Sequence, residues 1–184
     1  YFEELHEVYI DHARRIVRSA CRHTTAESFF IGCSWSCVSL IGPSIWRKWD
    51  KPVIRAVADE AHSQGRLLHI HYHGKCREVL SDLAECGADC VCPFERPPGG
   101  DITDLGEVRR ILDGRVTMNG NVHTVETLIR GSEESVRREV EEIFEQWGSN
   151  PRLILGTGDQ VGAETPEANI AAMIETGRRL GKTG

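Results

Sequence analysis

The feature of this sequence that most constrains its fold is a fivefold repeat of a short apolar run followed by a segment with helical periodicity. The apolar runs lie near residues 29, 68, 90, 116 and 153. A strand followed by a helix, repeated along a chain, is typical of a parallel sheet whose crossovers are right-handed. We therefore predict an α/β fold built from five βα units.

Periodicity, capping residues and turn residues give approximate bounds to these elements. We predict strands over residues 28–33, 67–72, 89–94, 116–119 and 153–156. We predict helices over residues 1–23, 43–64, 75–86, 104–113, 122–130, 132–147 and 166–180. Pro52 should kink or split the second helix because proline has no N–H to donate, and Thr165 should cap the last helix.

Two architectures accommodate this repeat. A TIM (β/α)8 barrel needs eight such units and about 250 residues, so the 184 residues would supply its five C-terminal units as one domain, 1–184. We then expect an N-terminal segment to complete the barrel. The alternative is a doubly wound open sheet of five strands, but no GxGxxG or GxxxxGK[ST] loop follows any strand, which weakens a nucleotide-binding version of it. We favour the barrel.

Composition excludes several classes of function. The chain has 22 Lys and Arg against 28 Asp and Glu, a net charge of −6, and no basic stripe that would bind nucleic acid. No apolar run reaches about 18 residues and no signal peptide opens the chain, so we expect no membrane span and a cytoplasmic location.

Cysteine usage points to a reducing compartment. The seven cysteines include no CxxC pair, and an odd number without secretory context favours reduced thiols. We expect Cys33 and Cys37 to be buried, small apolar residues near a pocket rather than a thiolate pair.

The segment His69-Ile70-His71-Tyr72-His73 places three imidazoles within five residues. Strand alternation puts all three on one face, with His69 deepest and His71 and His73 at the C-terminal end, where parallel α/β folds carry their chemistry. The alternative is a strand with one buried, hydrogen-bonded histidine and two histidines on the surface.

Metal donors also follow other predicted strands. Glu95 comes after the third strand and Asp159 after the fifth, so with His71 and His73 they are four donors from three strand ends. Neutral imidazole nitrogens and carboxylate oxygens bind divalent metals in tetrahedral or five-coordinate geometry. We therefore predict a metal site formed by His71, His73, Glu95 and Asp159.

Several segments resemble the C-terminal portion of the uroporphyrinogen decarboxylase superfamily. They are Leu68 to Gly74, Asp82 to Asp89, Gly120 to Val122, Leu155 to Gly158 and Thr165 to Ile170. The resemblance implies a TIM barrel. The superfamily includes true decarboxylases and the zinc methyltransferases that move a methyl group from a corrinoid to a thiol, and it is similar to the zinc domain of cobalamin-independent methionine synthase.

The resemblance also implies a ligand set. In the methyltransferases a His-x-Cys, a later Cys and a Glu between them bind zinc, and His71-x-His73, Glu95 and Asp159 fall at the corresponding places. Replacement of both cysteines makes the site harder, so iron or manganese competes with zinc. The decarboxylase branch has a glycine-flanked histidine where this chain has Thr157, which disfavours decarboxylation.

We therefore expect a methyltransferase that uses zinc or another divalent metal, a small-molecule thiol acceptor and a corrinoid donor on a partner protein, with Trp35 and Asn121 as contacts to that cofactor. One alternative is a uroporphyrinogen decarboxylase whose Arg77 and Arg96 bind the carboxylates of a tetrapyrrole. The other is a non-enzymatic domain that binds metal or corrinoid. A homo-oligomer is compatible with each of these functions.

Overall fold

The computed structural model describes residues 1–112 and 114–181, and within them the chain forms a five-stranded sheet in the order β1-β2-β3-β4-β5. Every neighbouring pair of strands is parallel. The strands are β1 (Ser28–Gly32), β2 (Leu67–Tyr72), β3 (Cys90–Pro93), β4 (Thr117–Val122) and β5 (Leu153–Thr157). The longer helices are α1 (Phe2–His23), α3 (Pro43–Ser63), α5 (Leu105–Leu112), α6 (Glu133–Trp147) and α7 (Glu167–Leu180), and the short helical segments are α2 (Val38–Ile41), η1 (Arg77–Val79), α4 (Leu80–Glu85) and η2 (Thr124–Ile129).

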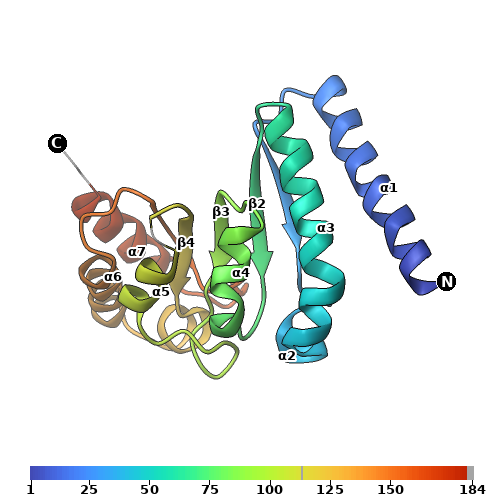
Figure 1. Ribbon diagram of the computed structural model, residues 1–184. Coiled ribbons are helices and arrows are strands. Elements are labelled where there is room, and N and C mark those ends of the chain that lie inside the picture. Colours follow the sequence, from blue (N-terminus) through green and yellow to red (C-terminus); the bar gives the residue numbers. More distant parts are fainter. Residues whose placement is uncertain (113, 182–184) are drawn as a thin grey trace.

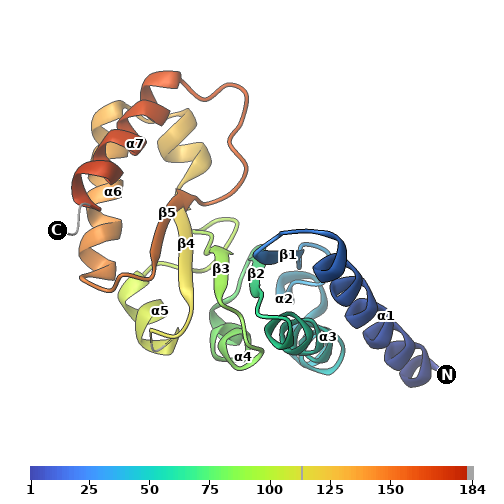
Figure 2. The same cartoon turned by 90° about the horizontal axis from the view of Figure 1, so that it is seen from above.

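The helices that follow the strands lie along one side of the sheet. Figure 1 shows the order of the elements, and in Figure 2 the strands form a curved row with α3, α4, α5 and α6 on its convex side. Leu68, Ile70 and Tyr72 of β2 face these helices and are buried, whereas Phe30 of β1 and Ile154 of β5 are exposed. A doubly wound sheet carries helices on both faces. The arrangement is instead that of a partial TIM-type barrel.

Helix α1 precedes the first strand and packs along α3. Its buried residues Ile10 and Val17 lie seven positions apart on one face, which is two helical turns. Arg18 reaches across to α3 and places Nη2 2.7 Å from a carboxylate oxygen of Glu60.

Helix α3 begins with Pro43 at its first turn and continues through Pro52. Pro52 was predicted to kink or split this helix, and the split is wrong, because one helix covers Pro43–Ser63. Proline removes only one backbone hydrogen bond, and the buried residues Trp46 and Ile54 hold the helix against the core on both sides of that position.

A cluster of charged residues ties α3 to α4. Asp82 accepts hydrogen bonds from Lys51 Nζ at 2.6 Å and from Arg47 Nε at 3.0 Å. Burial alone would raise the pKa of the Asp82 carboxyl, but the hydrogen bonds from Lys51 and Arg47 outweigh it and lower that pKa. The carboxylate therefore stabilises the packing of these two helices in its charged form.

Three other predicted bounds differ from the structure. The segment predicted as helix 75–86 is η1 followed by α4, because Asp101 accepts hydrogen bonds from the backbone N–H groups of Cys76 and Arg77. The segment predicted as helix 122–130 begins later, since β4 extends to Val122 and η2 follows it. The N-cap of α7 is Pro166 and not Thr165.

The other predicted strands and helices are confirmed to within a few residues, although residue 113, at the end of the helix predicted over 104–113, lies outside the described residues. Among the described residues, no helix combines the length and the apolar character that crossing a bilayer requires.

Candidate metal centre

Two imidazoles meet at the C-terminal end of β2. His71 is on the strand and His73 follows it, and the Nε2 atoms of the two rings lie 2.7 Å apart. The ring planes are nearly perpendicular, at 89°. Burial and the nearby His73 lower the pKa of His71, which favours the neutral imidazole that a metal ion requires.

Asp159, in the loop between β5 and α7, supplies the third converging group. Its Oδ1 lies 3.8 Å from Nε2 of His73, and its side chain is 46% exposed. One donor atom from each of His71, His73 and Asp159 lies within 4.8 Å of the others. Donors about 2.1 Å from a tetrahedral ion are about 3.4 Å apart, so modest side-chain rotations bring these three onto one ion.

Glu95, which follows β3, contacts the outer side of the His73 ring. Its Oε1 accepts a hydrogen bond from Nδ1 of His73 at 2.9 Å, and its Oε2 accepts one from the N–H of Gly74 at 2.5 Å. The carboxylate is 13% exposed. Among the described residues Glu95 therefore lies beside the converging group rather than in it, and metal binding by all four residues stays a prediction.

Cys92 contacts Nδ1 of His71, as Glu95 contacts Nδ1 of His73. Its Sγ lies 3.2 Å from Nδ1 of His71, and the residue is 8% exposed. Burial raises the pKa of this thiol to about 11. Cys92 could not be predicted as part of the site from the sequence, because its contact depends on the register that pairs His71 with Cys92 across β2 and β3.

Thr157, at the end of β5, was noted in the sequence as the residue that replaces the histidine of the decarboxylase branch, and in the structure it contacts Asp159. Its hydroxyl donates a hydrogen bond to the backbone carbonyl of Asp159 at 2.6 Å. This bond fixes the backbone of the loop from which the Asp159 carboxylate projects.

A cavity of about 300 Å³ adjoins the centre. Glu95, Arg96, His123 and Asp159 are among its lining residues. The Arg96 guanidinium pairs with Glu139 at 3.1 Å. His123 uses Nδ1 to accept the N–H of Glu126, and its Nε2 lies 3.3 Å from the carbonyl of Pro97, so both nitrogens of this ring already have protein partners.

The other candidate residues are not among the three converging donors. Trp35 is 92% exposed in the loop between β1 and α2, and Asn121 is buried, where its amide donates to the carbonyl of Phe94 at 2.9 Å. Their contact with a cofactor stays a prediction. Arg77 is exposed and pairs with Glu107 at 2.8 Å, outside the lining of the cavity.

The cysteines are free, as the sequence predicts. Cys33 and Cys37 are both buried. Cys33 lines a groove between α1, β1 and α3 rather than the cavity beside the histidines.

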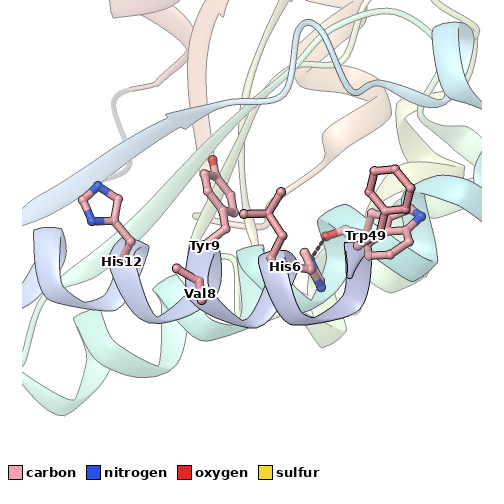
Figure 3. A pocket seen from close by; sticks show the side chains of 7 residues that line it. His6, Val8, Tyr9, His12 and Trp49 are labelled. Atoms are coloured by element: carbon pink, nitrogen blue, oxygen red, sulfur yellow. Dashed lines mark hydrogen bonds between the residues drawn. The ribbon is translucent and has the colours of Figure 1, made fainter.

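A second hollow lies on α1 (Figure 3), at the end of the molecule away from β3, β4 and β5 (Figure 1). Its volume is about 520 Å³ and its lining includes Leu5, Val8 and Tyr9. The ring of His6 lies within hydrogen-bonding distance of the carbonyl of Trp49, 2.7 Å from Nε2. This largely apolar hollow holds no converging donor set like the one beside β2.

Comparison with known proteins places this geometry in context. A family model described as uroporphyrinogen decarboxylase matches residues 2–180. The chain is 26% identical over 140 residues to a uroporphyrinogen decarboxylase of Coxiella burnetii, covering 74% of this chain and 36% of the relative. It is 29% identical over 105 residues to the methylcobamide:CoM methyltransferase MtaA of Methanosarcina barkeri, covering 57% of this chain and 28% of the relative.

Among solved structures, a methyltransferase from Methanosarcina mazei superposes with a TM-score of 0.72 and 22% identity. The match covers 95% of this chain and 47% of that one. At this identity the likeness establishes the fold. The chain thus spans less than half the length of each of these relatives.

Proposed function

The chain belongs to the uroporphyrinogen decarboxylase family, and we propose that it acts in the methyltransferase branch, transferring a methyl group to a small thiol with the help of a bound divalent metal. The observation that carries this proposal is the convergence of His71, His73 and Asp159 at the C-terminal edge of the sheet. A decarboxylase that works without a metal has no need for such a donor set.

The donor set fits a zinc ion or another divalent metal of similar preference. Two imidazole nitrogens and one carboxylate oxygen are suitable ligands, and three protein ligands leave a position open for substrate. When bound there, the ion would supply Lewis acidity that holds the acceptor sulfur as a thiolate at neutral pH.

The residues around the donors prepare them for this role. The Glu95 carboxylate accepts the Nδ1 proton of His73, which leaves the lone pair of that ring on Nε2. A carboxylate on the outer nitrogen also fixes the orientation of a metal-binding ring and raises its basicity. The lowered pKa of His71 keeps the second ring neutral near pH 7.

The adjoining cavity would hold the remainder of the acceptor. It opens beside Asp159, and Pro98 and Val125 give it apolar walls while Arg96 gives it a polar one. A volume of about 300 Å³ is at the lower limit of ligand pockets. The cavity therefore favours a thiol of few atoms over a large acceptor.

We assign the methyl donor to a corrinoid carried by a partner protein. A relative named as a methylcobamide:CoM methyltransferase supports this assignment. Trp35 offers a large exposed aromatic face in the loop after β1, and exposed aromatic side chains are enriched at binding surfaces. In the reaction the thiol would lose its proton, the methyl group would pass to its sulfur as the carbon–cobalt bond of the donor breaks, and the electron pair of that bond would stay on the partner's corrinoid.

Decarboxylation of a tetrapyrrole is the second candidate. It is favoured by Arg96 in the cavity wall, which would bind a substrate carboxylate, and by the longer matches to decarboxylases. Arg77, the other arginine considered for that role, already pairs with Glu107. A single arginine paired with Glu139 is a weak site for a substrate with several carboxylates.

Metal analysis of the purified protein separates the two candidates. We expect one zinc or other divalent ion per chain in the wild type, and loss of that ion in His71→Ala and Asp159→Ala. His62→Ala is the matched control, because His62 pairs with Asp89 on another part of the surface.

The second step of the test uses Co²⁺ in place of the native ion. Addition of 2-mercaptoethanol to the cobalt-loaded protein should produce a sulfur-to-cobalt charge-transfer band, and methylcobalamin should then methylate the thiol. A protein that binds no metal, or that decarboxylates uroporphyrinogen at full rate in the presence of a chelator, would contradict the proposal.

A further inference from the structure

We propose that Cys92 is a positioning residue whose thiol hydrogen-bonds both tautomers of His71, so that the ring keeps a partner at Nδ1 while the centre passes from its metal-free to its metal-bound form. This inference rests on the proposed metal-binding function and adds to it a residue and a role that the donor set does not contain.

The two imidazole rings have matching surroundings. Each imidazole has its Nε2 directed at the other ring and its Nδ1 in contact with a group that belongs to β3 or follows it. For His73 that group is Glu95, and for His71 it is Cys92. The register of β2 against β3 pairs His71 with Cys92, so the sheet itself places the thiol beside the ring.

The hydrogen bonds around the two rings determine where the protons of the metal-free centre lie. Both oxygens of Glu95 accept hydrogen bonds, so Nδ1 of His73 must be the donor in that contact. A neutral His73 then has its lone pair on Nε2, and the 2.7 Å contact requires His71 to donate from its own Nε2. Nδ1 of a neutral His71 is consequently an acceptor, and the Cys92 S–H is the donor to it.

Metal binding changes the position of the proton on His71. A ligating Nε2 cannot carry a proton, so His71 must lose its Nε2 proton to solvent and take up another proton at Nδ1 to remain a neutral ligand. Nδ1–H is then the donor and the Cys92 sulfur the acceptor. A thiol serves in both directions because it carries a donor and an acceptor, whereas an ionised carboxylate only accepts.

Cys92 is better placed for this role than for a direct one. Its sulfur lies on the Nδ1 side of His71, on the opposite side of the ring from the Nε2 that faces His73. At 8% exposure it offers little surface to a substrate. A nucleophile or a metal ligand would need the sulfur on the Nε2 side of the ring.

The test follows the His71 tautomer by two-bond ¹H–¹⁵N correlation spectra of the purified protein at pH 8, above the ordinary histidine pKa of about 6.5. We expect the Nε2–H form without metal and the Nδ1–H form after addition of one equivalent of Zn²⁺. Observation of the same tautomer in both states would overturn the inference without the need for any variant.

Variants then test the role of the thiol. Cys92→Ala should weaken Zn²⁺ binding by at least about tenfold, and Cys92→Ser, which keeps a donor and an acceptor, should restore most of the affinity. Cys90→Ala is the matched control, because Cys90 is two residues earlier on β3 and is paired in register with His69. It should leave both affinity and tautomer unchanged.

The outcomes separate this inference from the proposed function. If the wild type binds no Zn²⁺, the proposed function is wrong and the inference falls with it. If the wild type binds Zn²⁺ and Cys92→Ala binds it equally well with an unchanged tautomer, only the inference is wrong. If Cys92→Ala does not fold, the wild-type tautomers and the comparison of Cys92→Ser with wild type still decide.

Discussion

The replacement Glu95→Gln gives a sharp prediction, because the two oxygens of that carboxylate serve two different donors. Oε1 accepts from Nδ1 of His73 and Oε2 accepts from the N–H of Gly74. A glutamine has one oxygen and one NH2 group. If its oxygen serves His73, its NH2 faces the N–H of Gly74; if its NH2 serves His73, the ring must carry its proton on Nε2, where the metal would bind.

Either arrangement loses one hydrogen bond to a charged group, which is worth about 1.5–3 kcal/mol. Loss of such an outer contact costs a metal site about 10–100-fold in affinity, which is about 1.4–2.7 kcal/mol. The two figures agree, so we expect Glu95→Gln to weaken Zn²⁺ binding by about that factor. Competition with a chromophoric chelator measures the dissociation constant.

The matched control is Glu126→Gln, which removes the same charge from the lining of the same cavity. The Glu126 carboxylate is 59% exposed and pairs with Arg130 one turn away. We expect this variant to bind Zn²⁺ within about twofold of wild type, since exposed charges are well screened. Equal losses in the two variants would mean that cavity charge, and not the hydrogen bond to His73, governs affinity, and the reasoning would be refuted.

Three further predictions concern pH and the core. Burial and the nearby His73 lower the pKa of His71, so a proton on His71 should compete with Zn²⁺ only below the ordinary histidine pKa of about 6.5. A Zn²⁺ affinity that already falls between pH 8 and pH 7 would contradict this prediction. Asp82→Asn should lower the free energy of unfolding in urea by about 1.5–3 kcal/mol at pH 7, because the carboxylate accepts from Lys51 and Arg47. The pKa of Asp82 is lower in the folded protein than in the unfolded chain. The carboxylate therefore stabilises the fold at pH values above its unfolded pKa of about 3.9, and this stabilisation is lost as the pH falls through the folded pKa. The difference in free energy of unfolding between Asp82→Asn and wild type should therefore become smaller in acid. Trp46→Ala should cost about 3–5 kcal/mol in the same assay, because Trp46 is fully buried against Tyr72.

Periodicity predicted much of this fold because it records which side of each element is buried. The alternation of Leu68, Ile70 and Tyr72 with His69 and His71 shows in the sequence and returns as the two faces of β2. The repeat of strand and helix likewise limits the sheet to parallel order. These are properties of the local sequence, and they do not depend on which other elements each strand or helix packs against.

Local rules failed where packing opposed them. Proline disfavours the interior of a helix, yet α3 continues through Pro52 because buried residues on both sides of it hold the helix against the core. Thr165 is a good N-cap by residue type, but its hydroxyl has no hydrogen-bond partner and Pro166 occupies the cap position. At Pro52 tertiary contacts override helix propensity, and at Thr165 the N-cap falls one residue later than the residue type predicts.

Part of the candidate centre can likewise be predicted from local sequence, and part depends on tertiary structure. Strand ends predict that His71, His73 and Asp159 come together, because parallel strands place their C-terminal ends on one edge. The orientation of each ring depends instead on what touches its other nitrogen, and this is set by the register of β2 against β3 and by the turn that follows β3.

The three donors also differ in how firmly they are held, and this suggests an order of assembly. Both imidazoles are fixed on their Nδ1 side by Cys92 and Glu95 before any ion arrives. The backbone carbonyl of Asp159 accepts a hydrogen bond from the hydroxyl of Thr157, whereas its carboxylate lies 3.8 Å from His73 and is the most exposed of the three donors. A preorganised pair of nitrogens therefore meets the ion first, and the Asp159 carboxylate closes on it by a side-chain rotation. Asp159→Asn, which keeps the size of the donor and removes its charge, should therefore accelerate Zn²⁺ release, but by less than His71→Ala does.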